Sequence, residues 1–224
     1  MKIKGAIFDM DGTLVDSLGF WAQYWNKLGK KYFNQEGFVA PQEVDVKVRT
    51  MVLWQDVLYI KEYFNITDSA QALYDFTREE VDRFYKEDVV AKEGVFEFLD
   101  YLKECGIAMA VASASTKQDV INCLENCKLA PYFSCVLSSN DLGVGKDKPD
   151  VYIATMQQMG LKAEEVCVFE DSFVAIETAK KLGCKTVGIF DKNNFGHDRL
   201  RASSDMYLDD GMQMKSLIGK VDKG

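Results

Sequence analysis

The feature that most constrains the fold of this chain is a set of short apolar segments, each ending abruptly in small polar or acidic residues. These segments span residues 6–8, 107–112, 135–137, 166–169 and 187–190. Continuous apolar runs of this length are typical of strands that are buried on both faces, as in parallel sheets. We therefore expect the strands of a parallel sheet, with polar residues at their carboxyl ends.

Helical segments separate these apolar runs. The sequences EFLDYLKECG, VYIATMQQMG and VAIETAKKLG each end on a glycine, which suits the C-cap of a helix. Parallel strands need crossover connections, usually helices, so the alternation from about Lys92 onward predicts a doubly wound, Rossmann-like α/β sheet. Such sheets bind ligands at the carboxyl ends of their strands, where the polar residues would gather.

Residues 17–90 interrupt this alternation. Residues 21–33, 55–64 and 72–88 carry apolar side chains at the three- and four-residue spacing of helices, and Asp68 or Ser69 can cap the last one. All three tryptophans (Trp21, Trp25 and Trp54) lie in this segment, and we interpret its aromatic residues as core. We predict a core domain from residues 1–16 and 91–224 with a small α-helical domain, residues 17–90, inserted into it.

Charge and composition exclude several classes of protein. The 35 acidic and 27 basic residues give a net charge of −8 without a basic cluster, which argues against nucleic-acid and membrane-surface partners. The sequence contains no membrane-spanning apolar run or signal peptide, so we expect a soluble, cytoplasmic protein. The six cysteines lack a CxxC pair and are expected to be reduced core thiols. The single histidine, His197, is expected in a surface loop. Because the sequence has only one histidine, chemistry that needs two is excluded.

Two acidic pairs are expected to meet at the sheet edge. Asp9 and Asp11 follow the first apolar run, and Glu170 and Asp171 follow a later one. Converging carboxylates repel one another and raise their pKa values unless a cation lies among them. Oxygen ligands suit a hard ion, so the pattern predicts a Mg²⁺ site. Gly12 allows the chain to turn tightly after the first strand.

Two further residues suggest a phosphate site at the same edge. Ser113 ends the second apolar run and offers a hydroxyl and nearby backbone N–H groups that can bind phosphate oxygens. Lys146, in GVGKDKPD, would supply compensating positive charge.

In this order, the segments DMDGTLVDS, VASAS, GKDKPD and VFEDS resemble the four motifs of the haloacid dehalogenase superfamily. The resemblance covers nearly the whole chain and is to the phosphatase and β-phosphoglucomutase-like branch, which carries a helical cap inserted after the first strand. The lysine motif departs from the usual pattern, since Asp147 replaces a common proline. Pro149 and Asp150 keep the frame and favour Lys146 over Lys148 as the motif's lysine.

The resemblance implies a role for each motif residue. Asp9 would be the nucleophile that forms an aspartyl-phosphate, and Asp11 the general acid and then base. A carboxylate is already anionic at neutral pH and needs no activating histidine. The implied magnesium site comprises Asp9, Asp11 through its backbone carbonyl, Glu170 and Asp171. The implied phosphate-binding groups are Ser113, the Ala114 N–H and Lys146.

These features predict a magnesium-dependent phosphatase that acts on a small phosphorylated metabolite, a sugar phosphate or similar. They do not indicate the oligomeric state, for which a monomer is the default expectation. A dehalogenase would need neither magnesium nor Asp11. A receiver-type phosphoacceptor switch is shorter and lacks the insert. A sugar-phosphate mutase remains the main alternative, although mutases of this branch carry a histidine in the first cap helix, where this chain has Trp21. The substrate stays open, and the candidate specificity residues in the insert are Arg49, Trp54 and the tryptophans of the first cap helix, Trp21 and Trp25.

Overall fold

The structure is a computed structural model that describes residues 1–48, 51 and 53–224. The chain forms two compact units. Unit 1 consists of Met1–Leu18 and Val89–Gly224, and unit 2 of Gly19–Asp88. The bounds of unit 2 lie two residues inside each end of the insert expected from the sequence, 17–90. Arg49 lies outside the described residues.

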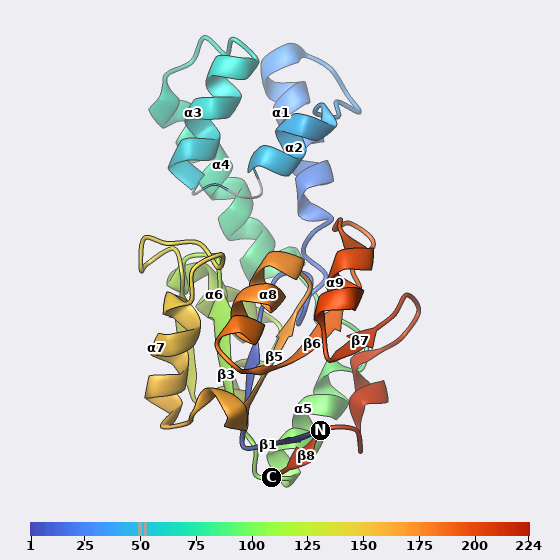
Figure 1. The fold of residues 1–224 in the computed structure, drawn as a ribbon. Coiled ribbons are helices and arrows are strands. Elements are labelled where there is room, and N and C mark those ends of the chain that lie inside the picture. The colour runs from blue at the N-terminus through green and yellow to red at the C-terminus, as the bar shows by residue number, and fades with distance from the viewer. Residues whose placement is uncertain (49–50, 52) are drawn as a thin grey trace. The chain divides into compact units, whose positions relative to one another are not determined.

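Unit 1 is built on a parallel sheet of six strands (Figure 1). Its strands are β2 (Gly5–Phe8), β3 (Ala108–Ser113), β4 (Cys135–Ser138), β5 (Val166–Glu170), β6 (Lys185–Ile189) and β7 (Met206–Leu208). Their order is β4-β3-β2-β5-β6-β7, and every neighbouring pair is parallel. β2, the first of these strands in the sequence, lies inside the sheet, and the later strands are added outward on both sides of it. The prediction of a doubly wound parallel sheet is confirmed.

Helices connect these strands. They are α5 (Val95–Glu104), α6 (Lys117–Asn126), α7 (Asp150–Met159), α8 (Phe173–Lys181) and α9 (His197–Ser203), with the short helices η2 (Ala130–Tyr132) and η3 (Ala163–Glu165). The short helix η4 (Met214–Leu217) follows β7. Gly160 ends α7 with a φ of 66°, in the left-handed conformation that glycine adopts without strain. The expectation for His197 is wrong, because this residue begins α9 and its ring lies 4.5 Å from that of Phe190.

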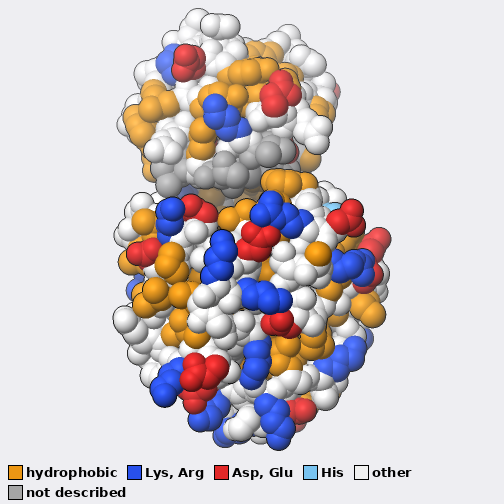
Figure 2. All heavy atoms as spheres, in the orientation of Figure 1, with side chains coloured by type: hydrophobic (Ala, Val, Ile, Leu, Met, Phe, Trp, Pro, Cys, Tyr) orange, Lys and Arg blue, Asp and Glu red, His pale blue; other side chains and the backbone are white. Residues whose placement is uncertain are grey.

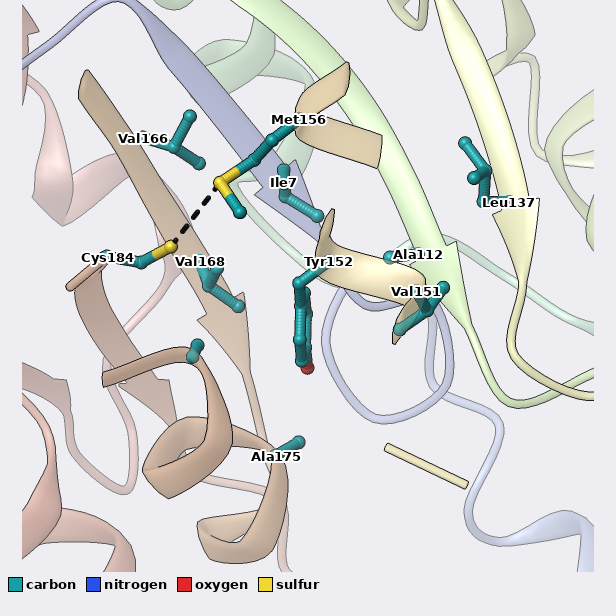
Figure 3. Close-up of a cluster of buried hydrophobic side chains, with 11 residues drawn as sticks. Ile7, Ala112, Leu137, Val151, Tyr152, Met156, Val166, Val168, Ala175 and Cys184 are labelled. Atoms are coloured by element: carbon teal, nitrogen blue, oxygen red, sulfur yellow. Dashed lines mark hydrogen bonds between the residues drawn. The ribbon is translucent and has the colours of Figure 1, made fainter. Parts of the chain in front are cut away.

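A buried apolar cluster holds α7 and α8 against the sheet (Figure 3). Ile7 and Val168 contribute from β2 and β5, and Tyr152 and Met156 from α7. The Cys184 Sγ lies 3.8 Å from the Met156 Sδ. All six cysteines are free thiols, and four of them are buried as expected for core thiols, whereas Cys105 and Cys135 are only partly buried. Burial of this apolar surface stabilises the fold by about 25 cal/mol per Å². It also fixes the start of α7, and with it the loop that carries Lys146.

Stacked aromatic rings hold the ends of the neighbouring strands β2 and β5 together. Phe8 pairs with Phe169 in the ladder, and their rings stack with centroids 4.5 Å apart. Phe98 packs edge-on against both rings. Because Phe8 and Phe169 are in register, the residues that follow them, Asp9 and Glu170, emerge side by side at the carboxyl edge of the sheet.

Two short ladders close unit 1. At the chain ends, β1 (Lys2–Ile3) pairs in parallel with β8 (Asp222–Lys223), so the termini lie close together (Figure 1). Near the insert, Val15 and Ala91 form an antiparallel bridge. The Lys92 N–H donates to the Leu14 carbonyl over 2.9 Å beside that bridge. The segments that lead into and out of unit 2 are therefore paired with each other within unit 1.

Unit 2 is helical in its described residues. It comprises α1 (Phe20–Phe33), α2 (Gln42–Val48), α3 (Leu53–Tyr63), α4 (Ala70–Arg83) and the π-helical turn η1 (Phe84–Asp88). Ser69 rather than Asp68 caps α4, since its Oγ accepts from the Ala72 N–H over 3.1 Å. Trp25 is buried in the core, as expected for the aromatic residues, whereas Trp54 is 43% exposed.

The visible face of unit 1 carries Lys and Arg side chains interspersed with Asp and Glu (Figure 2). No single sign of charge dominates that face, which agrees with the absence of a basic cluster in the sequence. Among the described residues, no helix combines the length and the apolar character needed to cross a membrane.

Candidate active site

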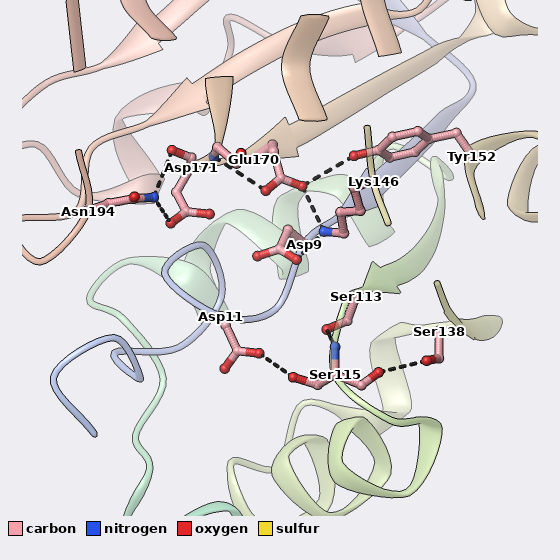
Figure 4. Close-up of polar contacts among 11 residues, drawn as sticks. Asp9, Asp11, Ser113, Ser115, Ser138, Lys146, Tyr152, Glu170, Asp171 and Asn194 are labelled. Atoms are coloured by element: carbon pink, nitrogen blue, oxygen red, sulfur yellow. Dashed lines mark hydrogen bonds and ion pairs between the residues drawn. The ribbon is translucent and has the colours of Figure 1, made fainter. Parts of the chain in front are cut away.

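Three buried carboxylates gather at the carboxyl ends of β2 and β5 (Figure 4). They belong to Asp9, Glu170 and Asp171, which each offer an oxygen within 4.8 Å of the others. The Asp9 N–H donates to the Phe169 carbonyl over 2.9 Å, which continues the pairing of β2 with β5. All three residues are at most 5% exposed. The two acidic pairs of the sequence thus contribute three of their four side chains to one buried cluster.

Lys146 brings a positive charge into this acidic cluster. Its Nζ donates to Asp9 Oδ1 and, over 2.8 Å, to Glu170 Oε2. Burial opposes protonation of Lys146, but the carboxylates of Asp9 and Glu170 outweigh it and hold the pKa of the ammonium well above its ordinary value. The Lys148 side chain is 63% exposed and lies 3.6 Å from Asp147. Lys146 is therefore the lysine of GKDKPD that contacts the acidic residues.

The charge in this cluster does not balance. Three carboxylates face one ammonium group. Burial is the main cause that raises the pKa of Asp9 to about 7, and the negative charge of Glu170 adds to the rise, although Lys146 opposes it. Burial, followed by the charge of Asp9, raises the pKa of Asp171 well above its ordinary value. A divalent cation would offset the excess negative charge, and an all-oxygen donor set suits a hard ion. The residues present therefore fit the predicted Mg²⁺.

Gly12 keeps the space beside Asp171 open. It has a φ of 79°, and a Cβ at this position would overlap the Asp171 carboxylate. Glycine is required at this turn for both reasons. Without a side chain, the backbone at Gly12 can pass close to the Asp171 carboxylate of the acidic cluster.

The other predicted residues lie around Ser115. Ser113 ends β3, is fully buried, and its Oγ accepts from the Ser115 N–H over 3.1 Å. Ala114 is exposed between these two serines. The Ser115 Oγ donates to Asp11 Oδ2 over 2.8 Å, so the Asp11 carboxylate contacts the serine loop and does not belong to the three-carboxylate cluster.

Three residues near the site were not predicted from the sequence. The Asn194 side chain contacts Asp171, and the Tyr152 hydroxyl lies 3.3 Å from Glu170 Oε2. Ser115 contacts Asp11, as described above. The available signals were weak: a second serine in VASAS, an asparagine pair shortly after an apolar run, and a tyrosine on a helix that otherwise reads as core.

Several known proteins with similar sequences are named as phosphatases. The chain is 25% identical over 203 residues to the phosphorylated carbohydrates phosphatase of Thermotoga maritima, which covers 90% of this chain and 92% of that protein. It is 28% identical over 227 residues to the phosphoglycolate phosphatase of Pectobacterium atrosepticum, with coverage of 97% and 93%.

Solved structures show the same fold. CbbY of Rhodobacter sphaeroides in complex with phosphate superposes with a TM-score of 0.78 at 18% identity over 96% of both chains. β-Phosphoglucomutase of Clostridium difficile gives a TM-score of 0.72 at 16% identity over 96% of this chain and 93% of that chain. The family model of the haloacid dehalogenase-like hydrolases matches residues 6–189, most of the chain. As its motifs predict, the chain belongs to the haloacid dehalogenase-like hydrolase family of enzymes.

Proposed function

We propose that this enzyme is a magnesium-dependent phosphatase that hydrolyses a phosphomonoester of a small metabolite, such as a sugar phosphate, through an aspartyl-phosphate on Asp9. The observation that carries the proposal is the buried contact of Lys146 with both Asp9 and Glu170. It places a fixed positive charge beside a carboxylate nucleophile, as phosphoryl transfer requires. The phosphatase names of the sequence relatives support the same reaction class.

In the first step, an Asp9 carboxylate oxygen would attack phosphorus while the bond from phosphorus to the alcohol oxygen breaks. Asp11 would protonate the departing oxygen as general acid. In the second step, Asp11 would take a proton from a water molecule that attacks the aspartyl-phosphate. The products are inorganic phosphate and regenerated Asp9. Ser113, the Ala114 N–H and Lys146 would bind the phosphoryl oxygens through both steps.

Asp9, Glu170, Asp171 and the backbone carbonyl of Asp11 are the residues that would hold Mg²⁺. When bound, the ion would offset the negative charge of the phosphoryl group and of the carboxylates around it. Lys146 already shares this task with respect to Asp9 and Glu170.

Unit 2 would serve as the helical cap and supply substrate specificity. Its aromatic residues divide by exposure: Trp25 is 2% exposed and belongs to the core, whereas Trp54 is 43% exposed and can meet a ligand. Trp54 is therefore the better candidate of the two for a substrate contact.

A sugar-phosphate mutase is the alternative, because the solved structures with this fold include a β-phosphoglucomutase. Mutases of this branch use a histidine in the first cap helix. The single histidine of this chain, His197, lies on α9 of unit 1, and residues 19–88 contain none. Hydrolysis is therefore the favoured reaction.

The test is an assay with p-nitrophenyl phosphate in the presence of Mg²⁺, in the presence of EDTA, and with Asp9→Asn. We expect hydrolysis only by the wild-type enzyme with Mg²⁺. Full activity in the variant, or indifference to chelation, would rule out the proposal. Incubation with β-glucose 1-phosphate separates the two reactions, since a phosphatase releases inorganic phosphate and a mutase produces glucose 6-phosphate.

A further inference from the structure

Ser115 contacts three different parts of the site with three different groups (Figure 4). Its N–H donates to Ser113 Oγ over 3.1 Å, and its hydroxyl donates to Asp11 Oδ2 over 2.8 Å. Its carbonyl accepts from the Ser138 hydroxyl over 2.7 Å. One residue therefore joins the end of β3, the first motif and the end of β4.

The direction of these hydrogen bonds follows from the chemistry of the groups. The Ser115 hydroxyl donates to Asp11 Oδ2. A carboxyl group can accept this hydrogen bond on one oxygen while its other oxygen carries the proton for the leaving group. The Ser113 oxygen accepts from a backbone N–H, so its own hydrogen points elsewhere and can be given to a phosphoryl oxygen. Ser115 thereby orients one proposed phosphate-binding group and one proposed acid/base at the same time.

Asp11 is less confined by burial than Asp9. Asp9 is 5% exposed and held by Lys146, whereas Asp11 is only half-buried and is followed by Gly12 at a φ of 79°. Burial alone does not fix the torsions of a half-buried carboxylate. A general acid must lie within hydrogen-bond reach of the leaving oxygen, and a displacement of about 1 Å can cost up to about a hundredfold in rate.

We infer that Ser115 is a positioning residue for Asp11, whose hydroxyl sets the carboxylate for proton transfer to the leaving oxygen. This inference rests on the proposed phosphatase function. A competing role for the same hydroxyl is a direct contact with the phosphoryl group. That role would affect every substrate alike, because all phosphomonoesters present the same phosphoryl oxygens. Positioning of Asp11 would affect only substrates whose leaving group needs a proton.

The test compares kcat/KM for a series of phosphomonoesters whose alcohols range from p-nitrophenol to a simple alkyl alcohol. This ratio reports the steps from substrate binding to loss of the alcohol, so it contains the general-acid step and excludes hydrolysis of the aspartyl-phosphate. Ser115→Ala keeps the backbone N–H and carbonyl and removes only the hydroxyl. We expect kcat/KM to fall about tenfold for the alkyl ester, which is the size expected for one lost hydrogen bond. It should change little for p-nitrophenyl phosphate.

Two further variants complete the experiment. Ser115→Thr retains a hydroxyl and should restore the wild-type dependence on the leaving group. Ser138→Ala removes the hydrogen bond to the Ser115 carbonyl and the one that Ser138 Oγ accepts from the Asp141 N–H, and it keeps the Ser115 hydroxyl that contacts Asp11. Any effect of this variant should be the same for all esters. Circular dichroism spectra of all the variants should match that of the wild type.

Different failures identify different errors. The inference is overturned if Ser115→Ala loses kcat/KM equally for aryl and alkyl esters, or for neither. In that case turnover by the wild type still supports the proposed function. A wild-type protein that hydrolyses none of the esters overturns the proposed function, and the inference with it.

Discussion

Asn194 holds Asp171 through two hydrogen bonds from a single amide group. The Asn194 Nδ2 donates to Asp171 Oδ2 over 2.6 Å and to the Asp171 carbonyl over 3.1 Å. The Asn194 Oδ1 accepts in turn from the Phe195 N–H over 2.8 Å, which fixes the orientation of the amide. Residues that orient metal ligands in this way contribute strongly to metal affinity.

Asn194→Ala should therefore weaken Mg²⁺ binding by about tenfold to a hundredfold. Calorimetric titration of the protein with MgCl₂ measures this affinity without reference to turnover. Asn122→Ala, on α6, is the matched control, since the described contact of that side chain is with Gln118 on the same helix. Equal Mg²⁺ affinity in wild type and Asn194→Ala would show that Asp171 does not depend on this contact or is not a ligand.

The two lysines of GKDKPD should differ sharply in importance. Lys146→Ala leaves the buried carboxylates of Asp9 and Glu170 without their shared cation, and a phosphate dianion would be repelled. We expect kcat/KM for p-nitrophenyl phosphate to fall at least about a hundredfold. Lys148→Ala, at a largely exposed position, should stay within about twofold of wild type. A reversed order would mean that the wrong lysine has been assigned to the site.

The two proposed tasks of Asp11 can be separated by the choice of leaving group. A nitrophenolate leaves without protonation, whereas an alkyl alcohol does not. Asp11→Asn should therefore still form the aspartyl-phosphate from p-nitrophenyl phosphate but hydrolyse it very slowly. Rapid mixing should show a burst of nitrophenolate approaching one equivalent per enzyme, and no burst of alcohol from an alkyl ester. A folded variant that gives no burst with either ester would exclude Asp11 as the acid/base.

Asp56, on α3, should make the stability of unit 2 depend on pH. It is 3% exposed, and its Oδ1 has no hydrogen-bond partner within the described part of the chain. Burial raises its pKa from 3.8 to about 8. Between these values the folded state binds more protons than the unfolded state, so the free energy of unfolding should fall as the pH rises from about 4 to about 8.

Asp56→Asn should remove this decline and stabilise unit 2 at pH 8 by about 1–3 kcal/mol. Denaturant unfolding followed by tryptophan fluorescence reports on this unit, because all three tryptophans lie in it. Asp75→Asn, at an exposed position on α4, should leave the pH dependence unchanged. The prediction fails if Asp56→Asn retains the wild-type slope of stability against pH.

The sheet was predictable because strands buried on both faces leave an unbroken apolar run in the sequence. The edge strand β7 was missed because it has only three residues, two of them half-buried. The helix α6 was missed because its first turn is polar, although Thr116 offers a capping signal: its Oγ1 accepts from the Asp119 N–H over 3.2 Å.

The site was predictable where its residues directly follow strands. Asp9 directly follows β2 and Glu170 ends the adjacent strand β5, so their proximity follows from the register of Phe8 with Phe169. Asn194 lies 23 residues beyond Asp171 in an irregular loop, and no periodic pattern specifies its contact. The same holds for Ser115 and Asp11, which lie 104 residues apart.

The bridge between Val15 and Ala91 bears on how this architecture can vary. Because the entry and exit segments are paired in unit 1, the ends of the intervening chain are already held together. The entropy cost of closing a loop grows only with the logarithm of its length, so these anchored ends can carry inserts of very different size at similar cost. The junction is therefore a natural point for exchange: a helical insert from a relative, grafted between residues 18 and 89, should leave the sheet and its acidic cluster folded. If unit 2 supplies specificity, as proposed above, substrate choice can in this way diversify independently of the chemistry.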